Sequence, residues 1–192
     1  FIYNSTFLNN GENSDINSGF GGAISTSGNL EIYDSNFINN TQYSSGGAIG
    51  FSGTNLIIER SKFINNTVSS SNGRGGAIWI EPSSPANIKI ENVLFDGSNS
   101  GAVYISNNRS SVEFNHVTFV NNSERSGSPG SITRNNGSQI TILNSIIWGN
   151  KGTDIISGYK QGLDNISYSL LQDGVTDFNT ATGTGILTSD PR

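Results

Sequence analysis

The 192-residue sequence contains no cysteine, a single histidine and few charged residues. The absence of cysteine excludes a disulfide scaffold, a thiolate nucleophile and a cysteine-based metal site. Charged residues make up 13% of the chain, and its 10 lysine and arginine residues are dispersed within a net charge of −5. This distribution offers no cationic surface for phosphates, so we do not expect a nucleic-acid partner. No stretch approaches the roughly 18 apolar residues that a membrane-spanning segment needs, so we expect none.

Glycine, asparagine and serine are abundant instead, with 24, 27 and 30 residues respectively. Apolar residues recur at regular positions, which argues against a disordered chain. The length suffices for one core, so we predict a single domain over residues 1–192. The chain begins at Phe1 without a basic or apolar leader and is at once in the strand pattern described below. This start favours a segment of a longer, processed protein.

A ten-residue block recurs along the chain with an apolar anchor at its seventh position. Its copies begin at residues 1, 31, 57, 89, 113, 141 and 165, and their anchors are Phe7, Phe37, Phe63, Phe95, Phe119, Ile147 and Leu171. The anchors are about 27 residues apart on average. A second motif runs out of phase with the first, as GGAI at 21–24, 46–49 and 75–78, SGAV at 100–103 and PGSI at 129–132. Two interleaved motifs with one period mean that each repeat holds at least two structural segments.

Each segment is too short for a helix and alternates apolar and polar residues, which indicates a strand with one buried face. Turn residues such as Gly28-Asn29 and Asn135-Asn136-Gly137 separate the segments. The sequence therefore predicts an all-β fold, a right-handed parallel β-helix of about six to seven coils with roughly 27 residues per coil. We expect regular coils over residues 1–150 and a degenerate last coil over 151–192. A β-sandwich would not repeat the same side chains at one period.

Asn-Asn pairs follow most of the anchors, at 9–10, 39–40, 65–66 and 121–122. Asparagine tolerates left-handed backbone geometry, and its amide can bond the same amide one coil away. We therefore expect a stacked asparagine column at a turn. An amide row that binds sugar is the alternative interpretation.

The strand that follows the GGAI motif supplies one candidate surface. If its isoleucines face inward, then Ala23, Ala48, Ala77, Ala102 and Ser131 face outward in a column. In the neighbouring row, Trp79 and Tyr104 lie on adjacent coils and are candidates for carbohydrate contact as an aromatic platform. The alternatives are two ordinary exposed aromatic residues, or contacts to a covering loop.

Two glutamates supply the second candidate. The repeat places Glu59 and Glu91 on neighbouring coils about 5 Å apart, a separation that fits a retaining glycosidase on geometry alone. The alternative is a Lys89–Glu113 ion pair beside two solvated glutamates. His116 has no predicted nucleophile beside it and is interpreted as a turn residue. No calcium or other metal signature is present, so no metal and no cofactor is predicted.

N-glycosylation sequons occur at Asn4, Asn39, Asn65, Asn108, Asn121, Asn136 and Asn165. The ends of a β-helix are edges of unpaired backbone groups. We expect flanking sequence or end-to-end stacking of subunits to cover them, so the isolated segment should self-associate.

The pairing of GGA-[IV] with FxxN resembles the repeats of the chlamydial polymorphic outer-membrane proteins, a family of autotransporter adhesins. The resemblance rests on the three GGAI motifs and on FLNN, FINN, FINN and FVNN at 7–10, 37–40, 63–66 and 119–122. It covers residues 1–150 and implies an adhesive passenger on a cell surface. The C-terminal part, with NSIIWGN at 144–150 and SDPR at 189–192, is similar to secreted right-handed parallel β-helix repeat proteins of bacteria and archaea. That likeness implies a secreted or anchored surface protein.

Two functions follow from these observations. The first is a non-catalytic extracellular or cell-surface rod that serves adhesion, a sheath or a filament, with a host or cell-surface glycan or protein as its partner. The second is a carbohydrate-binding or polysaccharide-cleaving β-helix that uses Glu59, Glu91 and Lys89, or the face of Trp79 and Tyr104. We expect the first, and therefore no enzyme activity.

Overall fold

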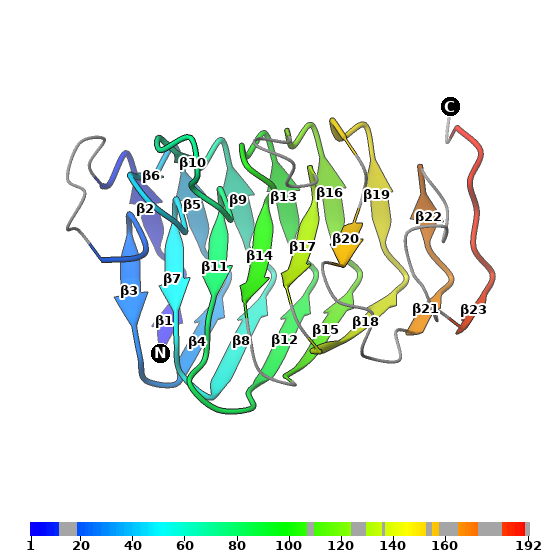
Figure 1. The fold of residues 1–192 in the computed structure, drawn as a ribbon, viewed down its shortest axis with the longest axis horizontal. Helices are drawn as coiled ribbons and strands as arrows, with labels where there is room; N and C mark the ends of the chain where they lie inside the picture. Colours follow the sequence, from blue (N-terminus) through cyan, green and yellow to red (C-terminus); the bar gives the residue numbers. More distant parts are fainter. Residues whose placement is uncertain are drawn as a thin grey trace.

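The computed structural model is an all-β solenoid of parallel sheets (Figure 1). It describes residues 1–11, 19–106, 110–123, 130–135, 137–152, 155–157, 165–172 and 182–190. Each strand pairs in parallel with its equivalent one repeat away, and paired residues are 17 to 32 positions apart. The predicted parallel β-helix is confirmed. Its handedness and its coil count stay predictions.

Sheet A contains the strand before each anchor. Its eight strands, in order, are β1 (Ile2–Tyr3), β4 (Leu30–Tyr33), β8 (Asn55–Glu59), β12 (Asn87–Glu91), β15 (Ser111–Asn115), β18 (Gln139–Leu143), β21 (Asn165–Ser167) and β23 (Thr182–Thr184). Alternation fixes its register, because Leu56 and Ile58 are buried whereas Ile57 and Glu59 lie on the outer face.

Sheet B carries the anchors. Its strands, in order, are β2 (Thr6–Leu8), β5 (Asn36–Ile38), β9 (Lys62–Ile64), β13 (Leu94–Asp96), β16 (Thr118–Val120), β19 (Ile146–Trp148) and β22 (Leu170–Leu171). Five phenylalanine rings form a continuous stack in the core, with successive centroids 4.7, 4.7, 5.0 and 4.7 Å apart: Phe7, Phe37, Phe63, Phe95 and Phe119. These distances match the spacing of neighbouring strands, so like side chains lie directly on one another.

Sheet D follows the GGAI motif and closes the coil. Its strands are β3 (Ile24–Thr26), β7 (Ile49–Phe51), β11 (Ile78–Ile80), β14 (Val103–Ser106), β17 (Ile132–Asn135) and β20 (Ile155–Ser157). A short fourth sheet, C, pairs β6 (Thr41–Gln42) with β10 (Thr67–Val68). Each regular repeat therefore supplies one strand to each of the three long sheets.

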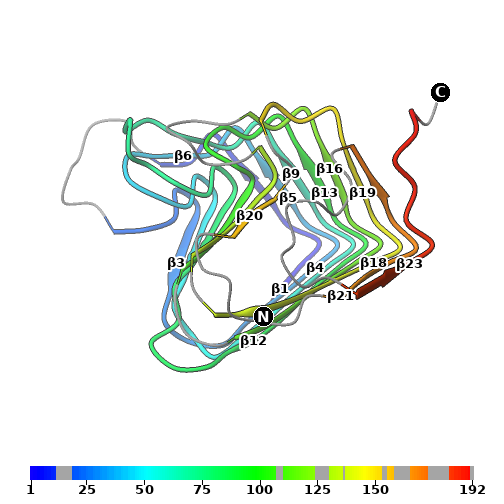
Figure 2. The same ribbon diagram turned by 45° about the vertical axis from the view of Figure 1, so that its right-hand side comes forward.

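Sheets A and B meet at a sharp corner that is the same in every coil (Figure 2). The core residue of sheet A precedes the anchor of sheet B by five positions throughout, as in Ile32 and Phe37 or Ile58 and Phe63. One corner residue in each coil has a positive φ, between 47° and 54°: Asn4, Asp34, Arg60, Asn92, His116, Asn144 and Tyr168. The prediction that His116 is a turn residue in this row is confirmed.

The Asn-Asn pairs divide two tasks between their members. The first asparagine adopts a left-handed turn conformation, as at Asn39 and Asn65 with φ of 54° and 52°. The second forms an amide ladder and is buried at every pair except the first, where Asn10 is exposed. In this ladder the side-chain amide of Asn40 donates to Oδ1 of Asn66 at 2.9 Å. The amide of Asn66 also donates to the carbonyl of Phe37 at 2.9 Å. The predicted asparagine column is confirmed, and these contacts are internal.

The Gly-Gly pair turns the chain into sheet D. Gly46 has a φ of +68°, and a Cβ on Gly47 would lie 2.0 Å from the carbonyl oxygen of Gly76. The prediction that the alanine column faces outward is wrong, because Ala48, Ala77, Ala102 and Ser131 are fully buried and Ala23 packs against the core. The residues before Ile49 lie in the bend, where both Ala48 and Ile49 donate to the carbonyl of Ala77. The alternation of a strand does not extend through such a bend.

Candidate functional site

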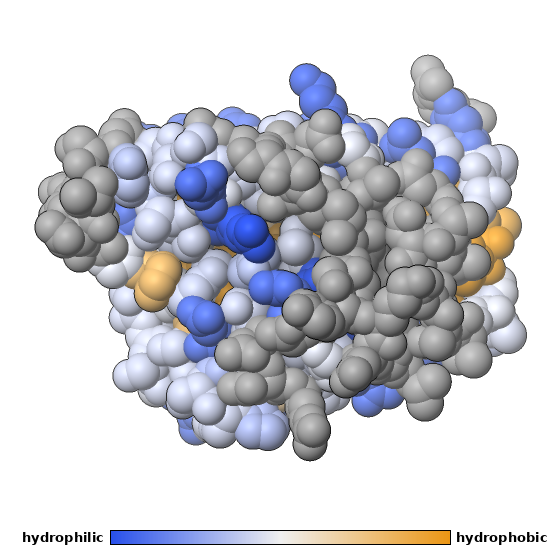
Figure 3. Space-filling model, viewed as in Figure 1, coloured by the Kyte–Doolittle hydropathy of each residue, from blue (hydrophilic) through white to orange (hydrophobic). Residues whose placement is uncertain are grey.

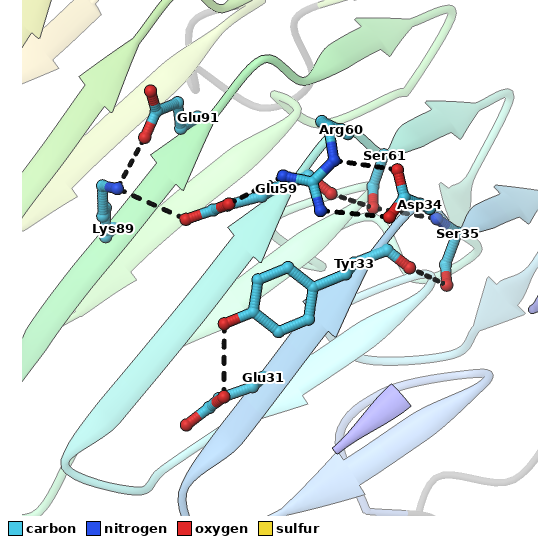
Figure 4. Close-up of polar contacts among 9 residues, drawn as sticks. All are labelled: Glu31, Tyr33, Asp34, Ser35, Glu59, Arg60, Ser61, Lys89 and Glu91. Atoms are coloured by element: carbon cyan, nitrogen blue, oxygen red, sulfur yellow. Dashed lines mark hydrogen bonds and ion pairs between the residues drawn. The ribbon is translucent and has the colours of Figure 1, made fainter. Parts of the chain in front are cut away.

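The outer face of sheet A brings the predicted glutamates together. Glu59 and Glu91 are paired residues of β8 and β12 and so occupy neighbouring coils, as predicted. The Lys89 ammonium lies between them, with Nζ 3.3 Å from Glu59 Oε1 and 2.5 Å from Glu91 Oε2 (Figure 4). These hydrogen bonds, first to Glu91 and then to Glu59, raise the pKa of Lys89 above its ordinary value.

The predicted Lys89–Glu113 ion pair is wrong. Glu113 is the register neighbour of Lys89 in β15, but the ion pairs of Lys89 are with Glu59 and Glu91. Glu91 is two residues along the same strand and Glu59 is on the preceding coil, so both carboxylates lie within reach of the flexible lysine. The register of the strands alone therefore does not predict which glutamate forms an ion pair with Lys89.

The chain of charges continues into the preceding coil through the corner row. Arg60 donates to both oxygens of Asp34 at 2.9 and 3.0 Å and to Glu59 at 2.9 Å. These hydrogen bonds lower the pKa of Asp34 and raise that of Arg60. Asp34, Arg60, Glu59, Lys89 and Glu91 thus form one ion-pair chain across three coils.

Tyr33 lies beside this chain. Its hydroxyl donates to Glu31 at 3.2 Å, and the Arg60 guanidinium lies 5.6 Å from its ring centroid. Partial desolvation raises the pKa of the Tyr33 hydroxyl, and the hydrogen bond to Glu31 acts in the same direction. The outer face of sheet A is therefore a connected polar surface.

The contacts of this glutamate pair limit the chemistry open to it. Lys89 contacts both Glu59 and Glu91, and Glu59 also accepts a hydrogen bond from Arg60. The side chains of the two glutamates are 21% and 25% exposed, so neither lies in the apolar pocket in which a glycosidase holds its general acid. The arrangement suits ion pairing between coils better than proton transfer.

Trp79 and Tyr104 lie on the outer face of sheet D and are paired in register, as predicted. The interpretation that they are exposed is wrong, since they retain only 7% and 4% of their accessible surface. Phe20 lies over Trp79, with ring centroids 3.8 Å apart and planes inclined by 20°. Contact with a covering segment was the alternative interpretation, and it is confirmed for Trp79.

Tyr104 is covered by polar groups instead. Arg74 places its guanidinium 5.0 Å from the ring centroid and donates to the hydroxyl at 2.7 Å. The amide of Asn135 donates to the same hydroxyl at 3.2 Å. The Tyr104 hydroxyl, one coil from Trp79, thus holds together a guanidinium from the coil of Trp79 and an amide from the coil beyond.

Five of the sequon asparagines lie in the described part of the chain, and all five are exposed: Asn4, Asn39, Asn65, Asn121 and Asn165. The first four have a positive φ in turns. Asn108 and Asn136 lie outside the described residues. Glycosylation at these positions stays a prediction.

The sequence did not predict two features of the structure. The first is a serine ladder at the corner between sheets A and B. The backbone N–H of Ser5 donates to the hydroxyl of Ser35, and the N–H of Ser35 donates to the hydroxyl of Ser61, each at 3.1 Å. A serine two residues before the anchor was its visible signal. Phe20, the cover of Trp79, lies outside the repeated blocks, so no periodic signal could have indicated its contact.

Comparisons of the chain with protein-family models, curated proteins and solved structures find no match. The resemblance to the autotransporter adhesins therefore stays a prediction. The described residues include no helix of the length and apolarity that crossing a membrane requires. They also include no group of three or more His, Cys, Asp or Glu residues that could hold a metal ion.

Proposed function

We propose that the protein is a non-catalytic structural rod of an extracellular or cell surface, which serves adhesion or forms part of a sheath or filament. The observation that carries this proposal is the ion-pair chain from Asp34 to Glu91. A polysaccharide-cleaving enzyme would need the carboxylates of this chain as its acid and nucleophile. Here they form ion pairs that connect three successive coils. The buried asparagine and serine ladders connect coils in the same way. The extracellular location rests on the resemblance of the repeats to surface proteins.

Polysaccharide cleavage is the activity that would contradict this proposal. The chain and its Glu59→Gln and Glu91→Gln variants are incubated with a panel of plant, bacterial and animal polysaccharides, and new reducing ends are measured. We expect no turnover by any of the three proteins. Turnover by the unaltered chain that both substitutions abolish would show that the glutamate pair is catalytic and that the rod interpretation is wrong.

We further propose that the isolated chain self-associates through its first coil. Strands β1, β2 and β3 lie at the edges of sheets A, B and D. Phe1, Tyr3 and Leu8 are 84%, 60% and 53% exposed there, and the Phe7 ring is only partly buried. Edge strands with apolar side chains are templates for pairing with another chain.

Sedimentation velocity over a range of concentrations tests this association. We expect oligomers whose share rises with concentration and falls in the Ile2→Lys variant, which places a charge at the exposed end of the core. Asn92→Lys, at an exposed corner in the middle of the rod, is the matched control and should associate like the parent. A parent chain that stays monomeric at every concentration would contradict the association.

A further inference from the structure

The cover of Trp79 is a single side chain laid across the outer face of sheet D. Phe20 stacks on the indole at 3.8 Å and is itself 41% exposed. Water therefore reaches the outer side of the phenyl ring, and Trp79 is 7% exposed beneath it. Removing this one ring would uncover a flat aromatic surface. Figure 3 shows this side of the molecule; among the described residues, which are drawn in colour, hydrophilic surface predominates there.

Phe20 reaches Trp79 by crossing over a glycine. Gly50 lies between Ser25 and Trp79 in the outward row of sheet D. A Cβ on Gly50 would lie 2.4 Å from the Cβ of Phe20 and 2.5 Å from its carbonyl carbon, so the crossing requires glycine there. Because Gly50 has no side chain, the segment that contains Phe20 can pass over it and lie against the indole, two coils away.

Among the described residues, the glycines on either side of Phe20 attach the crossing segment to the next coil. The amide of Gln42 donates to the carbonyl of Gly19, and the N–H of Gly21 donates to the carbonyl of Ser45 at 3.2 Å. Gly21 has a φ of +89°, a conformation that glycine adopts freely. The ring would lift by rotation about these glycines, which precede the paired residues, since the ladder between β3 and β7 begins at Ile24.

The surface beside Trp79 carries the polar groups that a sugar requires. The Tyr104 hydroxyl lies on the next coil, and it accepts hydrogen bonds from Arg74, which precedes Trp79 on its own coil, and from the Asn135 amide in β17, one coil further. Within the described residues Arg74 has no carboxylate partner. An aromatic face takes the apolar face of a pyranose, and neighbouring planar donors bind its hydroxyl or carboxylate groups.

From these contacts we infer that Trp79 is a binding platform for a pyranose ring of a sugar polymer, and that Phe20 occupies the platform until a sugar displaces it. Tyr104, Arg74 and Asn135 bind the substituents of the same or the next sugar ring. The stacked phenyl ring occupies the position of the ligand. The apparent affinity for a sugar is therefore the intrinsic affinity multiplied by the fraction of time that the indole is uncovered. This inference does not depend on the rod function, since a polysaccharide-cleaving protein would use the same platform.

Two substitutions uncover Trp79 by independent means. Phe20→Ala removes the covering ring, whereas Gly50→Ala keeps it but blocks its path. The chain has two tryptophans, Trp79 and Trp148. Both variants are made in a Trp148→Phe background, so that all tryptophan emission comes from Trp79. The emission of Trp79 should then shift to longer wavelength and become more accessible to iodide quenching. Far-ultraviolet circular dichroism verifies that each variant keeps its sheets.

The binding test uses cellohexaose as a neutral probe and hexagalacturonate as an acidic one, followed by calorimetry and by Trp79 emission. Because the competing aromatic stack is removed, both uncovered variants should bind a hexasaccharide about two- to tenfold more tightly than the parent. Trp79→Leu should abolish binding, and Tyr33→Ala, which removes a ring from sheet A, should leave it unchanged. Arg74→Gln should weaken hexagalacturonate more than cellohexaose.

Either probe binding with this pattern supports the inference. It would be overturned if both uncovered variants expose Trp79 to iodide and yet bind neither hexasaccharide at millimolar concentration. It would equally be overturned if binding persists in Trp79→Leu. A lack of cleavage by any variant bears only on the rod function, so the two proposals fail separately.

Discussion

The rings of Phe37 and Phe63 lie parallel within 3°, with their centroids 4.7 Å apart. The two residues are paired in neighbouring strands β5 and β9, and both are fully buried. The separation of the rings is thus the separation of two coils, and the same contact repeats from Phe7 to Phe119. Each interior ring has a partner on both faces, whereas the ring of Phe7 has one.

Removing an interior ring should be costly. Phe63→Ala deletes a buried side chain between Phe37 and Phe95, and the expected loss in the free energy of unfolding is about 3–5 kcal/mol. Urea unfolding followed by circular dichroism measures it. Phe7→Ala is the matched control, since that ring is partly buried and stacks on one face only, and it should cost clearly less. Equal losses for the two variants would show that the stack does not act through burial between coils.

The asparagine ladder should be as important as the apolar core. In the Asn66→Ala variant, the backbone N–H and the side-chain amide of Asn40 lose their common acceptor. The carbonyl of Phe37 loses its donor. Buried groups left without partners cost about 1–3 kcal/mol each, so a total loss of roughly 2–5 kcal/mol is expected. Asn65→Gly, at the adjacent exposed turn position with a positive φ, should be nearly neutral. A neutral Asn66→Ala would contradict the structural role of the ladder.

Ser98 interrupts this ladder between Asn66 and Asn122. Its N–H donates to Oδ1 of Asn122, but its buried hydroxyl has no partner within the described residues. Ser98→Asn should complete the amide column and raise the free energy of unfolding by about 1 kcal/mol. Thermal unfolding compares it with Ser98→Ala, which removes only the unpaired hydroxyl and should change little. A destabilised Ser98→Asn would mean that the site is too tightly packed for the larger side chain.

Acid should weaken the contact between Asp34 and Arg60. The hydrogen bonds from Arg60 hold the pKa of Asp34 below its ordinary value of 3.8. A carboxylate with a lowered pKa in the folded state contributes stability above its unfolded pKa and loses it as the pH falls through the folded one. Asp34→Asn should therefore be less stable than the parent at pH 7, and the difference should shrink below about pH 4.

Unfolding midpoints measured from pH 7 to pH 2 give this difference. Glu113→Gln removes a carboxylate of the same sheet that lies outside the ion-pair chain, and it should show a smaller difference at pH 7. A difference for Asp34→Asn that does not change with pH would argue against the charged contact.

The repeat predicted most of the coil because its information is local and periodic. Ile32, Ile58 and Ile90 lie in register because any other pairing would move apolar residues to the outer face. The same reasoning from the sequence predicts that Glu59 lies beside Glu91 and Trp79 beside Tyr104, as the structure shows. Register could thus be read from the sequence wherever one face of a strand is buried.

The remaining contacts depend on atoms that the period does not constrain. The ammonium of Lys89 had three glutamates within reach, and side-chain geometry selected Glu59 and Glu91. Phe20 contacts Trp79 from two coils away through a segment that belongs to neither repeated block. Ala48 faces inward because it lies in a bend, where the alternation of a strand has already ended.

The invariant corner between sheets A and B has a consequence for how such a chain can change. The core positions on its two sides are always five positions apart, so the differences in repeat length arise at the other two corners. Residues 82–85 form one such connection, between β11 and β12. Insertions at those corners would leave the stacked interior intact, and the solenoid can therefore acquire new recognition loops, or accept grafted peptides, without redesign of its framework.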